Sequence, residues 1–154
     1  MNFFMQTAID EARHGIVHNH GGPFGAVIVK DGEIISKAHN RVLRTNDPTA
    51  HAEILAIREA SSVLDNFDLS KCEIYTTSQP CPMCLAAIYW ARIKTIYFGS
   101  DKEDVAEIGF DDSHFYDLIC GDAEDPDFKT VRMDREKCLE LLDIWERKPD
   151  KQMY

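Results

Sequence analysis

The stretch TAHAEILAI, Thr49 to Ile57, combines a core helix with two residues that a core does not tolerate unpaired. Its Ala, Ile and Leu residues are typical of a helix that buries one face. His51 and Glu53 stand at the start of this apolar run, and both cost free energy when buried unless another group pairs with them. In mid-helix, residues two positions apart point about 200° away from each other. The two side chains can therefore face one site only if His51 lies at the very start of the helix.

A second stretch, QPCPMCLAA, supplies the partners. Cys81 and Cys84 are spaced i, i+3, which places both sulfurs on one side of a first helical turn that Pro82 is suited to begin. Two thiolates and the imidazole of His51 make three zinc ligands, and three protein ligands leave the fourth tetrahedral position open, as in catalytic sites. A redox dithiol is the alternative for Cys-x-x-Cys alone, but it leaves the upstream His-x-Glu unexplained. We expect one Zn²⁺ per chain.

Composition limits the classes of protein. The chain has 154 residues, 44% of them hydrophobic, which suits one domain with a sizeable core. A net charge of −10 disfavours nucleic acid as the main ligand, because phosphate binding needs basic surface. No run approaches the roughly 18 apolar residues of a bilayer span, and the first residues have helical rather than signal-peptide character. We expect a cytoplasmic enzyme or binding protein, in which cysteines are metal ligands or free thiols rather than disulfides.

Strands and helices are interleaved along the chain, which indicates a layered α/β fold. Main helices are predicted over 2–16, 48–64, 80–93 and 135–148, with short helical pieces within 102–110 and 111–119. Strands are predicted in a hairpin over 23–40, at 72–78, at 94–101 and, briefly, at 129–133.

Three details of these elements can be tested against the structure. The hairpin should turn at Asp31-Gly32, a dipeptide suited to a type I′ turn. The helix over 48–64 should follow a polar loop, with Asp47 as N-cap and Pro48 as first helical residue. The helix over 135–148 should turn its apolar side chains toward the core: Cys138, Leu141, Leu142 and Trp145.

The order His-x-Glu, then Pro-Cys-x-x-Cys, is the pattern of the zinc-dependent nucleobase deaminases. The segments GGPFGAVIVKDGEII, NDPTAHAEILAIR, PCPMCLAAIYWAR and GFDDSHFY closely resemble the bacterial guanine deaminases of the cytidine deaminase superfamily. The resemblance spans nearly the whole chain and is weakest over 120–150. It implies one deaminase domain over 1–154 with a three-layer α/β/α fold and a mixed sheet of about five strands. Residues from about 120 to 154 would form a C-terminal extension that is exchanged between the subunits of a homodimer.

The resemblance also implies a reaction. Zinc held by His51, Cys81 and Cys84 lowers the pKa of a bound water. Glu53 is not a ligand in this interpretation; it takes a proton from the water and passes it to a ring nitrogen and then to the leaving amine. The small-molecule substrate is guanine, the reacting carbon is C2 and the product is xanthine. Besides catalytic Glu53, Asp112 of GFDD would accept from the N–H groups of guanine and assist proton movement.

Further substrate contacts come from the same resemblance. Phe24 would line the pocket wall, Asn40 would hydrogen-bond the ring, and the backbone N–H of Ala52 would meet a polar edge of the base. Apart from the resemblance, Trp90 is a further candidate because it is on the helix that carries the cysteines, and a core position is its alternative. The chain ends on Tyr154, which in the family closes the pocket of the partner subunit.

Other interpretations stay open at this point. Asp111 and Asp112 can instead cap the following helix, and Asn40 can be a turn residue. Cytosine, guanosine or a triazine suits a small pocket too, whereas a transfer-RNA adenosine deaminase should carry more basic residues. A structural zinc module is the non-enzymatic alternative. The remaining histidines are expected to lie outside the site, with His114 nearest to the predicted pocket loop: His14, His18, His20, His39 and His114.

Overall fold

The computed structural model describes residues 2–154, and the chain divides into two units after Tyr116. The first unit holds every strand found among these residues. The second unit, Asp117–Tyr154, begins close to the expected start of a C-terminal extension and contains helix α7 (Arg135–Arg147).

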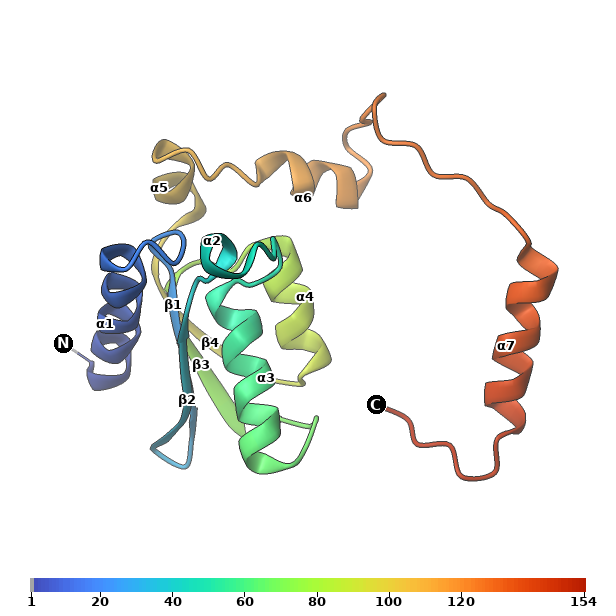
Figure 1. The fold of residues 1–154 in the computed structure, drawn as a ribbon, viewed down its shortest axis with the longest axis horizontal. Helices are drawn as coiled ribbons and strands as arrows, with labels where there is room; N and C mark the ends of the chain where they lie inside the picture. Colours follow the sequence, from blue (N-terminus) through green and yellow to red (C-terminus); the bar gives the residue numbers. More distant parts are fainter. Residues whose placement is uncertain (1) are drawn as a thin grey trace. The chain divides into compact units, whose positions relative to one another are not determined.

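A four-stranded mixed sheet is the centre of the first unit (Figure 1). Its described strands follow the order β2 (Glu33–His39), β1 (Gly25–Lys30), β3 (Cys72–Ser78) and β4 (Thr95–Ser100). Strand β1 pairs antiparallel with both β2 and β3, while β3 and β4 run parallel. Asp31 and Gly32 connect β1 to β2 with φ angles of 52° and 80°, as the predicted type I′ turn requires.

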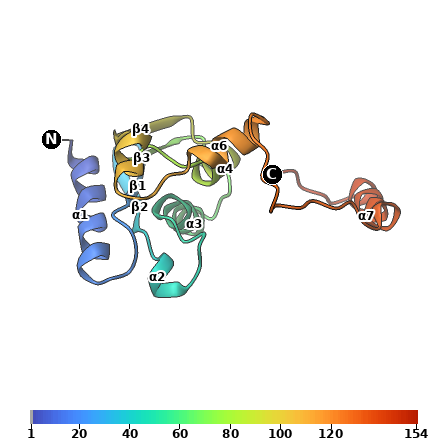
Figure 2. The same cartoon turned by 90° about the horizontal axis from the view of Figure 1, so that it is seen from above.

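Alternation along β1 produces three layers, which confirms the predicted α/β/α arrangement. Val27 and Val29 are buried on the face covered by α1 (Phe3–Val17). Ala26 and Ile28 are buried on the opposite face, in the core that includes residues of α3 (Ala52–Leu64) and α4 (Pro82–Trp90). Figures 1 and 2 show α1 on one side of the sheet and α3 with α4 on the other.

The start of α3 corrects the sequence prediction by four residues. The side chain of Asp47 accepts hydrogen bonds from the N–H and the hydroxyl of Thr49, at 2.8 and 2.7 Å, and so closes a local turn. Pro48 belongs to this turn, and the helix begins only at Ala52 with His51 as N-cap. The expected loop upstream also contains a short helix, α2 (Val42–Thr45).

The remaining helices of the first unit follow the prediction closely. Helix α4 has Pro82 at its first position, and α5 spans Lys102–Glu107. Helix α6, Ser113–Cys120, starts directly after GFDD. None of the helices within residues 2–154 combines the length and the apolar composition that a membrane span requires.

Two predictions for the C-terminal third are wrong. Residues 129–133 form no strand, because a strand needs a neighbour to pair with and the unit 117–154 contains none in its described residues. Thus the sheet has four strands instead of about five. Helix α7 forms where expected, but the side chains predicted to face the core are all exposed in the single chain: Cys138, Leu141, Leu142 and Trp145.

Helix α1 lies so close to the sheet that only glycine fits at position 25. A Cβ added to Gly25 would lie 2.0 Å from the carbonyl oxygen of Ala8 and 2.9 Å from the backbone nitrogen of Ala12. Since backbone atoms cannot move aside cheaply, Gly25→Ala should lower the free energy of unfolding by an amount at or above the top of the usual range of about 1–3 kcal/mol. Urea denaturation of the zinc-loaded protein measures the change. Val63→Ala, at a side chain that is 61% exposed, is the control and should shift it by less than about 0.5 kcal/mol.

Candidate metal centre and active site

Two helix N-termini meet at the candidate metal centre. His51 is the N-cap of α3 and Cys81 is the N-cap of α4, both with extended backbone angles. Neither side chain caps its own helix, although N-cap side chains usually do so. Cys84 follows in the first turn of α4 and is fully buried. The three side chains are turned toward one another instead of toward their own backbones.

The distances at this centre fit a tetrahedral zinc ion. Nδ1 of His51 lies 3.6 Å from Sγ of Cys81 and 3.5 Å from Sγ of Cys84. Zinc bonds to nitrogen and to thiolate sulfur of ordinary length, at a tetrahedral angle, require about 3.5 Å between the two ligand atoms. All three ligand atoms lie within 4.8 Å of one another. The donor set of one imidazole and two thiols therefore fits Zn²⁺ without rearrangement and leaves its fourth position for water.

The thiols are prepared for metal binding by their surroundings. A hydrogen bond from Cys84, together with His51, lowers the pKa of Cys81 to about 4. The same hydrogen bond and burial raise the pKa of Cys84, because its proton is held against the thiolate of Cys81. A metal ion removes this conflict, since it replaces the shared proton and binds both sulfurs as thiolates.

A pocket of about 500 Å³ opens beside the metal centre, within the first unit. Glu53 lines it with only 7% of its surface exposed, next to His51 and Cys81. Burial raises the pKa of Glu53, so this carboxyl group can hold a proton closer to neutral pH than an exposed glutamate. Its place on the first turn of α3 follows from the late start of that helix.

The polar and aromatic walls of the pocket come from three loops, before β1, after β2 and between α5 and α6. The carbonyl oxygen of the Asn40 side chain accepts from the backbone N–H of Gly22 and of Val42, at 3.3 and 3.1 Å. With its acceptor occupied, buried Asn40 keeps its NH₂ group as the donor toward a ligand. Phe24 meets Phe110 edge to face, with ring centres 5.2 Å apart. This pair forms an apolar surface suited to a flat ring.

The two aspartates of GFDD have different surroundings. Asp111 accepts from the backbone N–H of Ser113 at 2.9 Å, which is a local turn at the start of α6. Asp112 is half-buried in the pocket. The pKa of its carboxyl group is raised, first by burial and second by the negative charge of the nearby Cys81. The turn therefore occupies Asp111, while the carboxylate of Asp112 remains available inside the pocket.

The segment that carries Asp112 is hydrogen-bonded to the residue just before Cys81. The hydroxyl of Tyr116 donates to the carbonyl oxygen of Pro80, one residue before Cys81, at 3.0 Å. The ammonium group of Lys102 lies 5.4 Å from the centre of the Tyr116 ring. These contacts hold the end of the first unit against the loop that begins α4.

The pocket brings together most of the predicted site residues. Those found at the metal centre or in the pocket wall are Phe24, Asn40, His51, Glu53, Cys81, Cys84 and Asp112. The side chain of Ala52 is fully buried in the core, and its backbone N–H is one of the first-turn donors that no helical carbonyl reaches. Trp90 does not line this pocket: it is the last residue of α4, far along the helix from Cys81, and is 68% exposed.

Other residues stayed outside or were missed. Tyr154 belongs to the second unit, and its role over an active site stays a prediction. Sequence reasoning missed pocket residues of α2 and of the segment after β4: Val42, Leu43, Lys102, Val105, Phe110 and Phe115. Phe110 and Phe115 are part of the GFDDSHFY motif, so they could have been predicted from it. Helix α2 could not, because its residues belong to a polar stretch that is typical of a loop.

This arrangement can perform a metal-assisted hydrolysis. A three-ligand zinc site supplies an acidified water. A buried carboxyl group beside it can move protons, and a flat apolar slot with one amide donor and one carboxylate acceptor can orient a heterocycle.

Comparison with known proteins identifies the family. The model of the cytidine and deoxycytidylate deaminase zinc-binding region matches residues 1–100. Guanine deaminase of Bacillus subtilis is 44% identical over 151 residues, which is 98% of this chain and 97% of that protein. The X-ray structure of a guanine deaminase from B. subtilis has a TM-score of 0.89 and covers 100% of this chain and 99% of its own.

Two further relatives cover less of the chain. The tRNA-specific adenosine deaminase of Aquifex aeolicus is 47% identical over 102 residues, 66% of this chain and 67% of that protein. A structure of guanine deaminase from Nitrosomonas europaea is 34% identical with a TM-score of 0.67, and covers 71% of this chain and 63% of its own. Since the family model spans residues 1–100 and the B. subtilis relative nearly the whole length, this chain belongs to the zinc-binding cytidine and deoxycytidylate deaminase family.

Proposed function

We propose that this protein is a zinc-dependent guanine deaminase that converts guanine and water to xanthine and ammonia. The observation that carries the proposal is the position of the pocket wall formed by residues 102–115, which would select the substrate. The metal ligands and Glu53 lie within the matched region 1–100, but the wall from Lys102 to Phe115 lies beyond it. The likeness to guanine deaminase of B. subtilis covers 98% of the chain, whereas the likeness to the A. aeolicus tRNA-specific enzyme covers 66%.

The residues of the site have separate tasks in this reaction. When bound by His51, Cys81 and Cys84, zinc supplies an acidified water and polarises it for attack. Glu53 takes a proton from the water and delivers it to the ring nitrogen next to C2, and later to the amine, which leaves as ammonia. The raised pKa of Glu53 suits both halves of this transfer, because the group must hold a proton and then release it.

Recognition of guanine follows from the donor and acceptor groups of the pocket. Asp112 accepts from the N–H groups on the reacting side of the base, and the NH₂ group of Asn40 donates to a ring acceptor. The backbone N–H of Ala52 meets a second polar edge, while Phe24 and Phe110 hold the ring faces. Adenine has no N1–H, so a carboxylate acceptor at that position disfavours it.

A transfer-RNA substrate is the alternative raised by the relatives. Its anticodon carries a phosphate backbone, and proteins that bind such ligands present basic surface. This chain has a net charge of −10 and 27 acidic against 17 basic residues. The free base therefore fits better, and it also fits the cytoplasmic location expected from the sequence.

The C-terminal unit is proposed to complete the pocket of a second subunit. Helix α7 leaves large apolar side chains exposed in the single chain, among them Leu142 at 63% and Ile144 at 66%. A second copy of the chain can cover such a face, and exchange of an identical element is a low-cost route to a two-fold dimer. In this homodimer Tyr154 would lie over the partner's base and exclude water.

Glu53→Gln tests the proton transfer. The amide keeps the shape of the side chain but cannot accept a proton, so kcat on guanine should fall by at least about 10²- to 10⁴-fold. Zinc content, measured by elemental analysis, should stay at one per chain. Cys84→Ser is the matched change at a ligand and should lose zinc together with activity. Near wild-type turnover of Glu53→Gln would exclude the assigned role.

Asp112→Asn tests recognition, and Asp111→Asn is its neighbouring control. Loss of the carboxylate acceptor in a buried pocket should lower kcat/KM for guanine by about 10²- to 10⁴-fold. Asp111→Asn should change kcat/KM by less than about tenfold, because the carboxylate of Asp111, although it also lines the pocket, already accepts from the backbone N–H of Ser113. Equal losses in both variants would return Asp112 to a role in starting α6.

Removal of residues 151–154 tests the lid. Without Tyr154, zinc content and the unfolding transition should be unchanged, while guanine deamination should fall at least about tenfold because water enters the pocket. Tyr154→Phe is the conservative control and should keep most of the activity if the ring alone closes the site. A truncated protein with the full rate on guanine would contradict the lid whatever the oligomeric state.

A further inference from the structure

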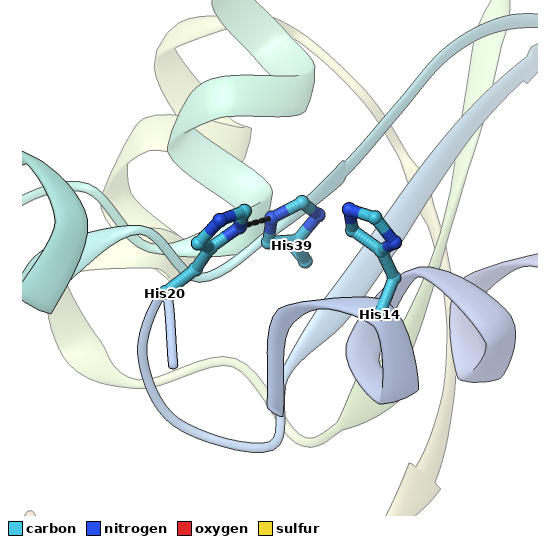
Figure 3. Close-up of side chains that lie close together, drawn as sticks. All are labelled: His14, His20 and His39. Carbon is cyan, nitrogen blue, oxygen red and sulfur yellow. Dashed lines mark hydrogen bonds between the residues drawn. The ribbon is translucent and has the colours of Figure 1, made fainter. Parts of the chain in front are cut away.

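Three histidines come together outside the active site, from three different parts of the first unit. His14 is on α1, His20 is in the loop that follows it, and His39 is the last residue of β2 (Figure 3). One imidazole nitrogen from each lies within 4.8 Å of the other two. Nδ1 of His20 is 2.8 Å from Nε2 of His39, and the rings of His14 and His39 meet edge to face at 5.2 Å.

The hydrogen bonds around His39 determine which of its nitrogens is free to bind. Nδ1 donates to Oε2 of Glu11 at 3.0 Å, and the other carboxylate oxygen of Glu11 is held by Lys37 at 3.1 Å. Nε2 of His39 therefore carries the lone pair that faces His20. A carboxylate behind the distal nitrogen is the arrangement that orients histidine ligands in metal sites.

The cluster is held rigidly at its inner side. His39 is 3% exposed, and a Cβ added to Gly15 of α1 would lie 2.8 Å from Cδ2 of its ring. The imidazole therefore packs directly against the helix backbone. His14 is exposed, so solvent can reach the cluster from the other side. A fixed inner ligand and an accessible outer one suit a site that takes up an ion after folding.

We propose that His14, His20 and His39 form a second site for a divalent transition-metal ion of the zinc, nickel and copper class. Imidazole is the ligand that these ions share, and three histidines leave a further position for water. On binding, His20 keeps one proton but carries it on Nε2 instead of Nδ1, and the ion takes the place of the hydrogen between His20 and His39. Net protonation is unchanged in this step.

The guanidinium group of Arg44 should weaken metal binding at this site. Its Nη1 lies 3.4 Å from Nε2 of His20, where the nitrogen must gain a proton when the metal binds. Two donors would then face each other, and the guanidinium also adds positive charge. Because the side chain is exposed, it can turn away at a cost. Its removal should therefore tighten binding.

The site lies directly behind the substrate pocket. Asn40 follows His39, Gly22 is two residues after His20, and the side chain of Asn40 accepts from the N–H of Gly22. Both Asn40 and Gly22 line the pocket. An ion on the histidines would thus tie together the two segments that this hydrogen bond joins. Its expected effect is stabilisation of the pocket wall, whatever base the enzyme accepts.

Calorimetric titration of the tag-free, zinc-loaded protein with Ni²⁺ tests the proposal. The wild-type chain should bind one equivalent beyond the catalytic zinc, and Ni²⁺ should raise the melting temperature. His14→Asn, at an exposed residue that leaves the core intact, should lose this equivalent and the thermal shift while keeping the catalytic zinc. Arg44→Ala should bind Ni²⁺ more tightly than wild type.

His18→Asn is the control for a histidine-rich surface. Its ring lies near His14, and its Nδ1 is 2.8 Å from the carbonyl oxygen of His14, but it is outside the three proposed ligands. The control should keep the second equivalent. The site would be refuted if wild type binds no Ni²⁺ beyond the catalytic centre. It would also be refuted if His14→Asn binds Ni²⁺ as wild type does, or if His18→Asn loses binding.

Discussion

The convergence of two helix N-termini on one ion is the constraint on which the active site depends. His51 and Cys81 occupy N-cap positions but do not cap, so α3 and α4 give up the usual side-chain bonds at their first turns. Metal coordination replaces those bonds, and the partial positive charge at both helix starts favours the thiolates. The same geometry brings Glu53 to the metal, because a residue in the first turn lies beside the N-cap.

Small residues make this convergence possible. The core face of α3 is built from alanines, with Ala52, Ala56 and Ala60 all fully buried, and α1 meets the sheet through Ala8 and Ala12. Small side chains on such a face let a helix backbone approach the sheet closely, as α1 does at Gly25. Large core side chains are supplied by the strands, with Ile28 and Ile74 among the most buried. Rigid packing behind the site keeps the ligand distances near those of a tetrahedral ion.

The metal centre and one wall of the pocket come from different parts of the chain. Residues 1–100, which match the family model, hold the three candidate metal ligands, Glu53 and Asn40. The segment from α5 to the start of α6 then adds one wall with an aromatic ring and a carboxylate, fastened by Tyr116 to the loop before Cys81. A reaction centre and a pocket wall that come from separate segments allow one fold to serve different substrates.

Residue types and local spacing were enough to predict the metal ligands, because an imidazole at one helix start, His51, and two thiols at another, Cys81 and Cys84, make a three-ligand zinc set. Local patterns likewise predicted the hairpin, β3 and α4 closely.

The other features depend on long-range packing. Asp47 caps a turn instead of a helix because its carboxylate accepts from Thr49, and α3 begins only at Ala52, with His51 as its N-cap. Residues 129–133 have strand-like composition but no strand to pair with among the described residues of their unit, and the rest of that unit does not cover the apolar face of α7. The histidine cluster could not be predicted from the sequence, because His14, His20 and His39 show no ligand spacing along the chain. The packing of α1 against the end of β2 brings their nitrogens together.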